Sequence, residues 1–164
     1  KGVSPAGTIE AHEIPAKPLD PYSYYNGDFI ALEKAHLNKG WKLVDNWHPD
    51  NKAGKRNGFV DVPMLEATRP GDRLTLDFHG KAIGIFCVSG PSAGILEYSV
   101  DGAPFKELDT FTEWSHNLYI PWVYMLETEL KDMDHKLVLR ISKKKNPASQ
   151  GTECQIRNFV VNGR

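Results

Sequence analysis

Short segments with alternating apolar and polar side chains recur along this chain. They are residues 73–78, 95–100 and 136–141, and in each of them most apolar residues share one parity. A period of two places those residues on one face of a β-strand, so each segment predicts a strand with one buried face. Residues 82–88 are apolar throughout, which predicts a central strand buried on both faces.

The C-terminal segment 154–161 also alternates, but its phase changes part of the way along. Cys154 and Ile156 share one parity, whereas Phe159 and Val161 share the other. The segment still predicts a strand. Cys87 and Cys154 are the only cysteines, and both lie in predicted strands, so we expect buried thiols, with a disulfide as the alternative.

Turn signals separate the predicted strands. They are Pro70-Gly71, His79-Gly80, Gly90-Pro91, Asp101-Gly102 and Asn162-Gly163. Short strands at intervals of about ten residues favour a sandwich or barrel over alternating strands and helices. Only residues 31–40, which end in Gly40, are expected to form a turn or two of helix. The predicted fold class is all-β: an antiparallel β-sandwich.

Length and charge limit the domain organisation and the partners. The 164 residues are typical of one domain, which we place at 21–164 behind a proline-rich leader or linker at 1–20. The net charge of −1 gives no general attraction to nucleic acid. No stretch approaches the roughly twenty apolar residues of a transmembrane helix, and the first residues lack a signal-peptide pattern. We therefore expect no nucleic-acid partner and no membrane span.

Residues 90–94, Gly-Pro-Ser-Ala-Gly, match the G-x-S-x-G pattern around the nucleophile of many hydrolases. Asp109 and His116 follow in the chain order that such enzymes use. The chemistry needs Ser92 on a turn between a strand and a helix, whereas residues 95–100 predict a second strand. We therefore interpret the motif as a glycine-rich turn and keep catalysis by Ser92 as the alternative.

Asp132 and His135 have the D-x-x-H spacing of the acid and base in SGNH esterases. The Gly-Asp-Ser block that places the nucleophile of those enzymes is missing here. A polar turn before the strand 136–141 is the favoured interpretation. The sequence therefore predicts no catalytic residue with this spacing.

Metal binding has little support in the sequence. The six histidines show no paired spacing. The segment 45–52 offers oxygen ligands suited to calcium, but the same residues are typical of a polar turn, which we favour. We expect no cofactor, with structural calcium as the alternative. The oxygen ligands in question are Asp45, Asn46, Asp50 and Asn51.

Residues 111–126 contain two of the four tryptophans of the chain. From 118 to 126 both parities are apolar, so a strand here cannot have one core face and one solvated face. Pro121 lacks a backbone donor, which favours an edge strand or a bulge. We expect Trp122 and Tyr124 to point inward.

The same segment also offers the chemistry of a sugar site. Proteins bind sugars with aromatic faces and with short polar side chains that hydrogen-bond to hydroxyl groups. Trp114 and Tyr119 are expected at the surface, beside the polar residues of a loop. The candidate ligand-binding residues are Trp114, His116, Tyr119 and Trp122.

Much of the chain resembles the C-terminal β-sandwich region of bacterial SGNH (GDSL-type) hydrolases. The most specific parts of the resemblance are residues 90–102, GPSAGILEYSVDG, and residues 146–151, NPASQG. Relatives commonly carry Asp where Ser92 stands, which argues against Ser92 as a nucleophile. The other segments that carry the resemblance are 18–30, 39–41, 82–89, 103–111, 118–126, 137–145 and 152–162.

The resemblance implies a jelly-roll domain similar to galactose-binding domains and carbohydrate-binding modules. It also implies a secreted or periplasmic parent protein that is a carbohydrate esterase. The catalytic residues of that esterase are not carried over, because the chain lacks the Gly-Asp-Ser block. The chain alone is therefore not expected to be an enzyme.

Three hypotheses for the function follow. The leading one is a non-catalytic module that binds a carbohydrate ligand, or covers the active site of the SGNH-type catalytic domain of the same parent chain. The second is a purely structural domain that docks on that catalytic domain through an apolar patch. The third is a hydrolase that uses Ser92 or a carboxylate pair drawn from Glu97, Asp109 and Glu113.

Overall fold

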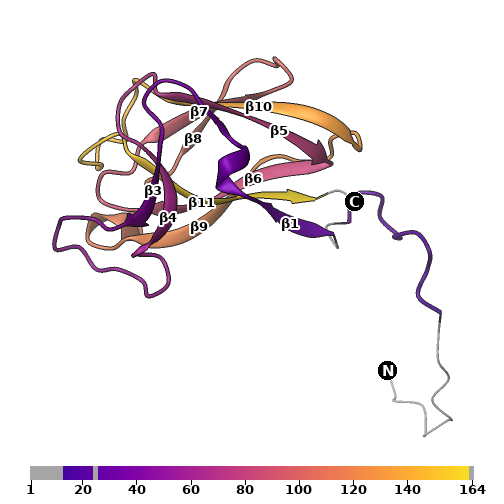
Figure 1. Ribbon diagram of the computed structural model, residues 1–164, viewed down its shortest axis with the longest axis horizontal. Coiled ribbons are helices and arrows are strands. Elements are labelled where there is room, and N and C mark those ends of the chain that lie inside the picture. The colour runs from indigo at the N-terminus through magenta and orange to yellow at the C-terminus, as the bar shows by residue number, and fades with distance from the viewer. Residues whose placement is uncertain (1–12, 24–25, 163–164) are drawn as a thin grey trace, which may run out of the picture.

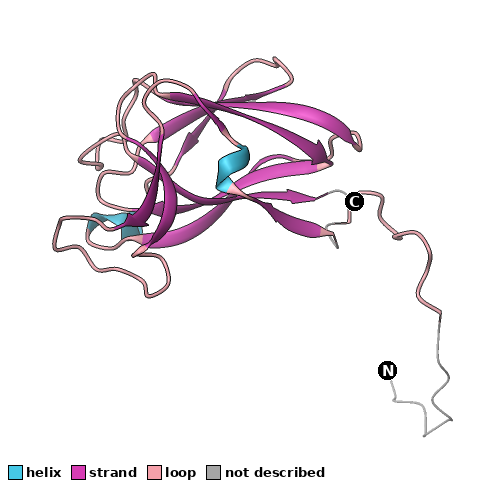
Figure 2. Ribbon diagram, in the orientation of Figure 1, coloured by secondary structure: helices cyan, strands magenta, loops and turns pink. Residues whose placement is uncertain are grey.

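The computed structural model describes residues 13–23 and 26–162. Two antiparallel sheets pack face to face, with loops joining them at both ends (Figures 1 and 2). The predicted all-β sandwich of the jelly-roll class is confirmed. Of the expected leader, residues 1–12 lie outside the described residues, and 13–20 contain no helix or strand.

Sheet A contains six strands. Five follow one another across the sheet, and β1 pairs with the C-terminal half of β11. The strands in order are β3 (Lys42–Trp47), β4 (Val62–Ala67), β11 (Cys154–Asn162), β6 (Ala82–Ser89) and β9 (Ile120–Glu127), with β1 (Gly27–Ile30) beside β11.

Sheet B contains five strands. Its two longest, β5 and β10, pair along most of their length. The strands in order are β2 (His36–Leu37), β5 (Arg73–Gly80), β10 (Met133–Ile141), β7 (Ile95–Val100) and β8 (Lys106–Asp109). Two short 3₁₀ helices, η1 (Leu32–Lys34) and η2 (Glu113–His116), lie in connections.

The core between the sheets is built by the residues that the alternation singled out. Leu74 and Leu76 of β5, Leu96 of β7, and Leu137 and Leu139 of β10 are completely buried. All six predicted strands are present. The expected helix in 31–40 was wrong beyond η1, because β2 pairs with β5 at His36 and Leu37 and so ends the helical turn.

The phase change in the last strand has a direct cause. The pairing of β11 with β6 shifts between Ile156 and Asn158, where β11 carries an extra residue. Such a bulge reverses the side-chain parity beyond it. Cys154, Ile156 and Phe159 therefore all face the core despite their different parity.

Both cysteines are free and buried in the core, as predicted. Burial raises the pKa of the Cys87 thiol to about 12. The thiol therefore stays protonated at neutral pH and is unreactive. In the part of the chain that the structure describes, no helix has both the length and the apolar character needed to cross a membrane.

Strand β9 is an edge strand, as Pro121 predicted, and pairs only with β6. Tyr124 and Leu126 pack against the core. The expectation that Trp122 points inward was wrong, because its side chain is 42% exposed. At the edge of a sandwich the core ends, so a residue of inward parity can still contact solvent.

Candidate functional site

The connection between β3 and β4, residues 48–61, folds over the outer face of sheet A. In Figure 1 this long loop lies at the end of the sheet far from β1. Two backbone hydrogen bonds hold it: Gly54 N donates to Asn117 O, and Tyr119 N donates to Gly54 O, both at 2.7 Å. Beneath the loop a second hydrophobic cluster forms, which consists of Trp47, Met64, Val88 and Tyr119.

A cavity of about 340 Å³ opens beside this cluster. We call it the loop-end cavity. It combines aromatic, carboxylate, amide and hydroxyl groups from distant parts of the chain. It is lined by Trp47, His48, Pro49, Asp50, Asn51, Glu66, Ser92, Tyr119, Glu153 and Gln155.

Tyr119 forms part of the cavity wall. The expectation that it lies at the surface was wrong, because only 4% of it is exposed. Its ring packs edge-to-face on Trp47 with centroids 5.5 Å apart, and a Cβ atom added to Gly90 would lie 2.1 Å from Tyr119 Cε1. The hydroxyl accepts a hydrogen bond from Asn51 Nδ2 at 2.8 Å and keeps its own proton to donate.

Glu66, on β4, is satisfied by protein partners. Trp47 Nε1 donates to its Oε1 at 3.0 Å, and Lys42 Nζ lies 2.9 Å from its Oε2. Burial alone would raise the pKa of this carboxyl, but the hydrogen bonds from Lys42 and Trp47 outweigh it and lower the pKa. Glu66 is therefore ionised and holds the indole of Trp47 in place.

Glu153, just before β11, is far less satisfied. Its one side-chain hydrogen bond within the described residues is a long one, 3.3 Å, from Gln155 Nε2. Burial, and then the negative charge of Glu66, raise the pKa of the Glu153 carboxyl. A half-buried carboxyl with so few partners has acceptor capacity left for a ligand.

Gln155, on β11, also has an unused hydrogen-bond acceptor. It is only 2% exposed, and it pairs with Glu66 across the two strands. The carboxylates of Glu66 and Glu153 both attract its NH₂ group, which orients the carbonyl oxygen away from them. Among the described residues, Trp41 Nε1 and Asn162 Nδ2 are the only side-chain nitrogen or oxygen atoms that are fully buried and have no hydrogen-bond partner. Gln155 Oε1 also has no partner among these residues, so it is not fully buried. Because Gln155 lines the cavity, this oxygen is accessible from there.

The cavity thus offers unused acceptors and donors close together. Glu153 and Gln155 Oε1 can accept hydrogen bonds, and the Tyr119 hydroxyl can donate one. The Trp47 indole and the Tyr119 ring make the wall behind them apolar. An apolar wall with a few converging polar groups is typical of a small-molecule site.

The other residues proposed from the sequence lie elsewhere. Trp114 is 60% exposed on η2, and His116 is exposed beside Phe111, with ring centroids 5.1 Å apart. Trp122 lies on β9, with its ring centroid 6.5 Å from that of Tyr124. Of the four candidates only Tyr119 lines the loop-end cavity. Ligand binding by Trp114, His116 and Trp122 stays a prediction.

The G-x-S-x-G motif is a turn between β6 and β7, as interpreted from the sequence. Asp109 accepts hydrogen bonds from Asn146 Nδ2 at 2.6 Å and from Phe111 N at 3.0 Å. Among the described residues no hydrogen bond joins Ser92 to Asp109 or His116. These three side chains therefore do not form a catalytic triad here.

The carboxylate pair proposed from the sequence is not assembled either. Glu97 lies on β7 and is bound by Arg140 Nε at 2.5 Å and by Ser142 Oγ at 2.8 Å. Asp109 is bonded to Asn146, and Glu113 is exposed on η2. Each of the three carboxylates is thus engaged by its own partners or by solvent.

The D-x-x-H spacing is likewise structural. His135 Nδ1 lies 2.6 Å from Asp101 Oδ2, and its Nε2 lies 2.8 Å from the carbonyl oxygen of Lys131. Asp132 instead lies 3.4 Å from His79. The acid and base of the pattern therefore do not meet.

Only the second half of the segment 45–52 forms the predicted polar turn, in which Asn51 Oδ1 accepts a hydrogen bond from Ala53 N at 3.0 Å. For residues 45–47 the prediction was wrong, because they belong to β3. Asp45 and Asn46 lie exposed on β3, whereas Asp50 and Asn51 line the cavity. Within residues 13–23 and 26–162, no group of three or more His, Cys, Asp or Glu side chains is placed to hold a metal ion. The expected lack of a cofactor stays a prediction.

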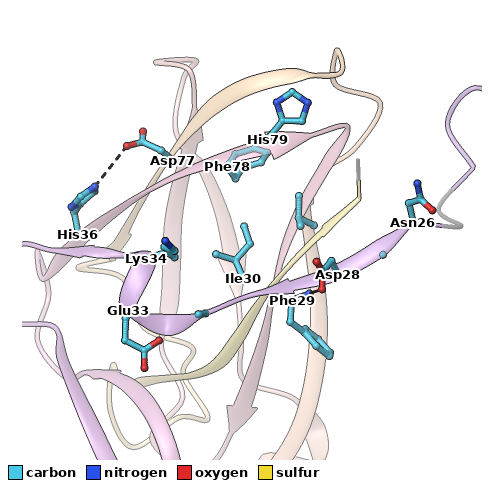
Figure 3. A pocket seen from close by; sticks show the side chains of 13 residues that line it. Asn26, Asp28, Phe29, Ile30, Glu33, Lys34, His36, Asp77, Phe78 and His79 are labelled. Carbon is cyan, nitrogen blue, oxygen red and sulfur yellow. Dashed lines mark hydrogen bonds and ion pairs between the residues drawn. The ribbon is translucent and has the colours of Figure 1, made fainter. Parts of the chain in front are cut away.

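A larger groove of about 790 Å³ lies at the open edge of the sandwich, between β1 and β5. Figure 3 shows Ile30 and Phe78 pointing into it, with His36 and Asp77 at its rim. His36 Nε2 and Asp77 Oδ2 are 3.7 Å apart, and both side chains are exposed. Its charged groups are solvated, so the groove lacks the buried, unused acceptors of the loop-end cavity.

Sequence reasoning missed Trp47, Glu66, Glu153 and Gln155. Each of the three polar residues alone is an ordinary polar residue of a strand or turn. What joins them is the pairing of β11 with β4, which places Gln155 opposite Glu66. The polar residues that flank Cys154 were the one local signal, because both point away from the core.

No protein-family model matches the chain, and no curated protein matches it. Solved structures share its fold. One is a two-domain esterase active on acetylated mannans, co-crystallised with mannopentaose: TM-score 0.67, 17% identity, covering 93% of this chain and 40% of that one.

Two further solved structures are similar. A family two carbohydrate esterase from Cellvibrio japonicus has a TM-score of 0.50 and 12% identity, and covers 85% of this chain and 34% of that one. An exo-β-1,3-galactanase from Phanerochaete chrysosporium with galactose has a TM-score of 0.52 and 12% identity, and covers 84% of this chain and 30% of that one. This chain spans 40% or less of each protein. Carbohydrate esterases therefore contain a part with the fold of this chain, as the resemblance implied.

Proposed function

We propose that this domain is a non-catalytic carbohydrate-binding module that accompanies an esterase catalytic domain in a longer chain. Its sugar site is the loop-end cavity. The observation that carries the proposal is the pair of unused acceptors, Glu153 and Gln155 Oε1, beside the donor hydroxyl of Tyr119. Sugar hydroxyl groups, which both donate and accept, match this set.

The similar solved structures support the proposal, because two of them are known with sugars. One was co-crystallised with mannopentaose and is active on acetylated mannans, and another contains galactose. Their identity to this chain is low, so the ligand has to be found by experiment. The proposal includes a secreted or periplasmic parent, since polymeric plant or microbial glycans lie outside the cell.

The test is a titration of the domain with manno-, xylo- and galacto-oligosaccharides, followed by tryptophan fluorescence and calorimetry. Trp47 lines the cavity, so a bound sugar is expected to change its emission. Gln155→Ala should abolish saturable binding. Glu113→Gln, a change at an exposed position on η2, is the control and should leave it intact. No binding of any sugar would remove the proposal.

The same titration separates the cavity from the exposed aromatic residues. If Trp114→Ala or Trp122→Ala removes binding and Gln155→Ala does not, the site lies at the edge formed by η2 and β9. The prediction that Trp114, His116 and Trp122 bind the ligand would then be right, and the placement of the sugar site in the loop-end cavity would be wrong. Both variants change exposed side chains, so folding should be unaffected.

A second candidate function has an observation of its own. The outer face of sheet A carries exposed apolar side chains near β1, including Phe29 at 60%, Val123 at 50% and Met125 at 46%. Val123 and Met125 line a depression of about 270 Å³ with Val160 and Val161. An exposed apolar patch is typical of a protein contact. Docking on the catalytic domain of the parent chain is therefore the alternative role.

Docking is tested by mixing this domain with the separately produced catalytic domain of its parent. A stable complex that Val123→Lys disrupts would support docking. Val138→Lys, a change of the same kind on β10 of the other sheet, is the matched control. A complex that neither change affects would place the contact elsewhere.

A further inference from the structure

Resting on the proposed function, we infer that the loop-end cavity selects sugars whose hydroxyl groups are free, and rejects O-acetylated sugars and uronic acids. For a domain that accompanies an esterase, this means that it binds the deacetylated product and not the ester substrate. The inference follows from the numbers of donors and acceptors in the cavity and from its charge.

Acceptors dominate the unused polar groups of the cavity. Each oxygen of Glu66 already accepts from one partner, Trp47 or Lys42. Asn51 donates to Tyr119 and accepts from Ala53. At the buried end the Glu153 carboxyl and Gln155 Oε1 are both acceptors, and the hydroxyl proton of Tyr119 is the donor beside them.

Two neighbouring acceptors require two donors from the ligand. A sugar with free vicinal hydroxyl groups supplies them, one to Glu153 and one to Gln155. Acetylation replaces the O–H donor by an ester whose carbonyl can only accept. A buried acceptor would then face another acceptor and lose its partner, which is costly in a site shielded from water.

Charge sets the second part of the selectivity. Glu66 is ionised, and Glu153 and Asp50 add carboxylates to the same wall. No lysine or arginine is among the described residues that line the cavity, and Lys42, beside Glu66, pairs with that carboxylate at 2.9 Å. A uronic acid would bring a further negative charge to a wall of carboxylates, so it should be repelled.

The test compares matched ligands on the wild-type domain. Manno-, xylo- and galactopentaose are each titrated in the free form and after chemical O-acetylation, with pentagalacturonic acid alongside, by calorimetry at pH 7. For every pentaose that binds, acetylation should weaken binding by at least about tenfold. Pentagalacturonic acid should show no binding.

The outcomes separate the two proposals. If no ligand of either form binds, the proposed function fails, and the inference fails with it. If the acetylated forms bind as tightly as the free forms or more tightly, the domain is a sugar-binding module but the inference is wrong. If pentagalacturonic acid binds as well as the neutral sugars, the charge selectivity is wrong.

One variant links the selectivity to a residue. Glu153→Gln keeps the shape and one acceptor but removes the charge, so it should admit pentagalacturonic acid or bind it at least about threefold better than the wild type does. Glu113→Gln removes the same charge far from the cavity wall and should change nothing. Equal rejection of the uronic acid by the wild type and Glu153→Gln would show that Glu153 does not set the selectivity.

Discussion

Two regions of this domain bury titratable side chains, and they differ in how completely those side chains are paired. In the region around His135, which we call the His135 cluster, both ring nitrogens have partners, in Asp101 and in the carbonyl of Lys131. In the loop-end cavity, Glu153 and Gln155 keep acceptors that no described residue uses. Pairing of this kind stabilises a fold, whereas buried polar groups without partners cost stability.

The pKa shifts of His135 and Glu153 show the same difference between the two regions. Burial alone would lower the pKa of His135, but the hydrogen bonds to Asp101 and to Lys131 outweigh it and raise the pKa. The protonated ring is therefore favoured by the fold. For Glu153, burial raises the pKa, and the charge of Glu66 adds to it. The ionised carboxylate is therefore disfavoured by the fold.

The largest expected effect is in the His135 cluster. His135→Ala should lower the free energy of unfolding by about 2–4 kcal/mol, measured by urea unfolding. It removes a ring stacked on Phe78, with centroids 5.3 Å apart, and leaves Asp101 and the Lys131 carbonyl without their partner. His36→Ala, at an exposed histidine, is the control and should cost less than about 0.5 kcal/mol. Equal losses would remove the contrast between paired and solvated histidines.

The pH dependence of stability checks the same cluster. Because the folded-state pKa of His135 lies above its ordinary value of 6.5, its contribution is fully present below pH 6.5 and is lost as the pH rises through the folded-state pKa. Unfolding midpoints measured between pH 5 and pH 9 should therefore decrease toward the alkaline end of this range. Asp101→Asn should flatten this part of the profile. An unchanged profile in that variant would show that Asp101 does not hold the proton.

A smaller loss is expected at the wall of the cavity. Gly90→Ala should cost about 1–3 kcal/mol, because the new methyl group would lie 2.1 Å from the Tyr119 ring and force it to move. Sugar binding should weaken with it, since the Tyr119 hydroxyl is displaced. Gly27→Ala, at a glycine with open space around it, is the control. Normal sugar affinity in Gly90→Ala would show that the hydroxyl is not part of the site.

The most informative prediction concerns Glu153. Its raised folded-state pKa means that protonation stabilises the fold at low pH, and that this contribution is lost as the pH rises through that pKa. Glu153→Gln should therefore increase stability at pH 7 by about 0.5–1 kcal/mol, with a smaller gain near pH 4. The same variant should bind neutral sugars more weakly. A loss of stability at pH 7 would show that the carboxylate is structural, like the His135 cluster.

The smallest effect is expected at the exposed aromatic residue on η2. Trp114→Ala should change the free energy of unfolding by less than about 0.5 kcal/mol, because 60% of the side chain is exposed. Thermal unfolding measures this directly. A loss above about 1 kcal/mol would mean that Trp114 packs as core, and a loss of sugar binding would move the site away from the cavity.

Much of the fold could be predicted from local pattern, and the strands that were not predicted lack a clear period of two. The strands with a clear period of two, such as β5 and β10, were predicted, because one face of each is buried along its whole length. Strands β1, β2, β3 and β8 were missed, since their exposed residues outnumber the buried ones and no alternation appears. Strand β4 was missed for another reason: it is buried on both faces, with Leu65 in the main core and Met64 in the second cluster, so it shows no alternation either. In the four exposed strands, pairing with a neighbour and not burial of one face holds the backbone.

The aromatic segment shows how far local pattern reaches within the site. Pro121 correctly predicted an edge strand, because its missing donor is an intrinsic property of the residue. The positions of Tyr119 and Trp122 were both wrong. Tyr119 is buried by a loop from elsewhere in the chain, and Trp122 is exposed because the core ends at the edge of the sheet.

The sequence by itself determined that this chain forms a β-sandwich, where most of its core strands lie, and that its cysteines are buried, because each depends on side-chain parity within a short segment. Only the tertiary structure decided where a ligand could bind. Glu66 and Gln155 are far apart in the chain and meet through the register of β4 and β11, and Tyr119 reaches them through the β3–β4 loop. A site made by pairing between distant strands leaves no local pattern, since no segment contains more than a part of it.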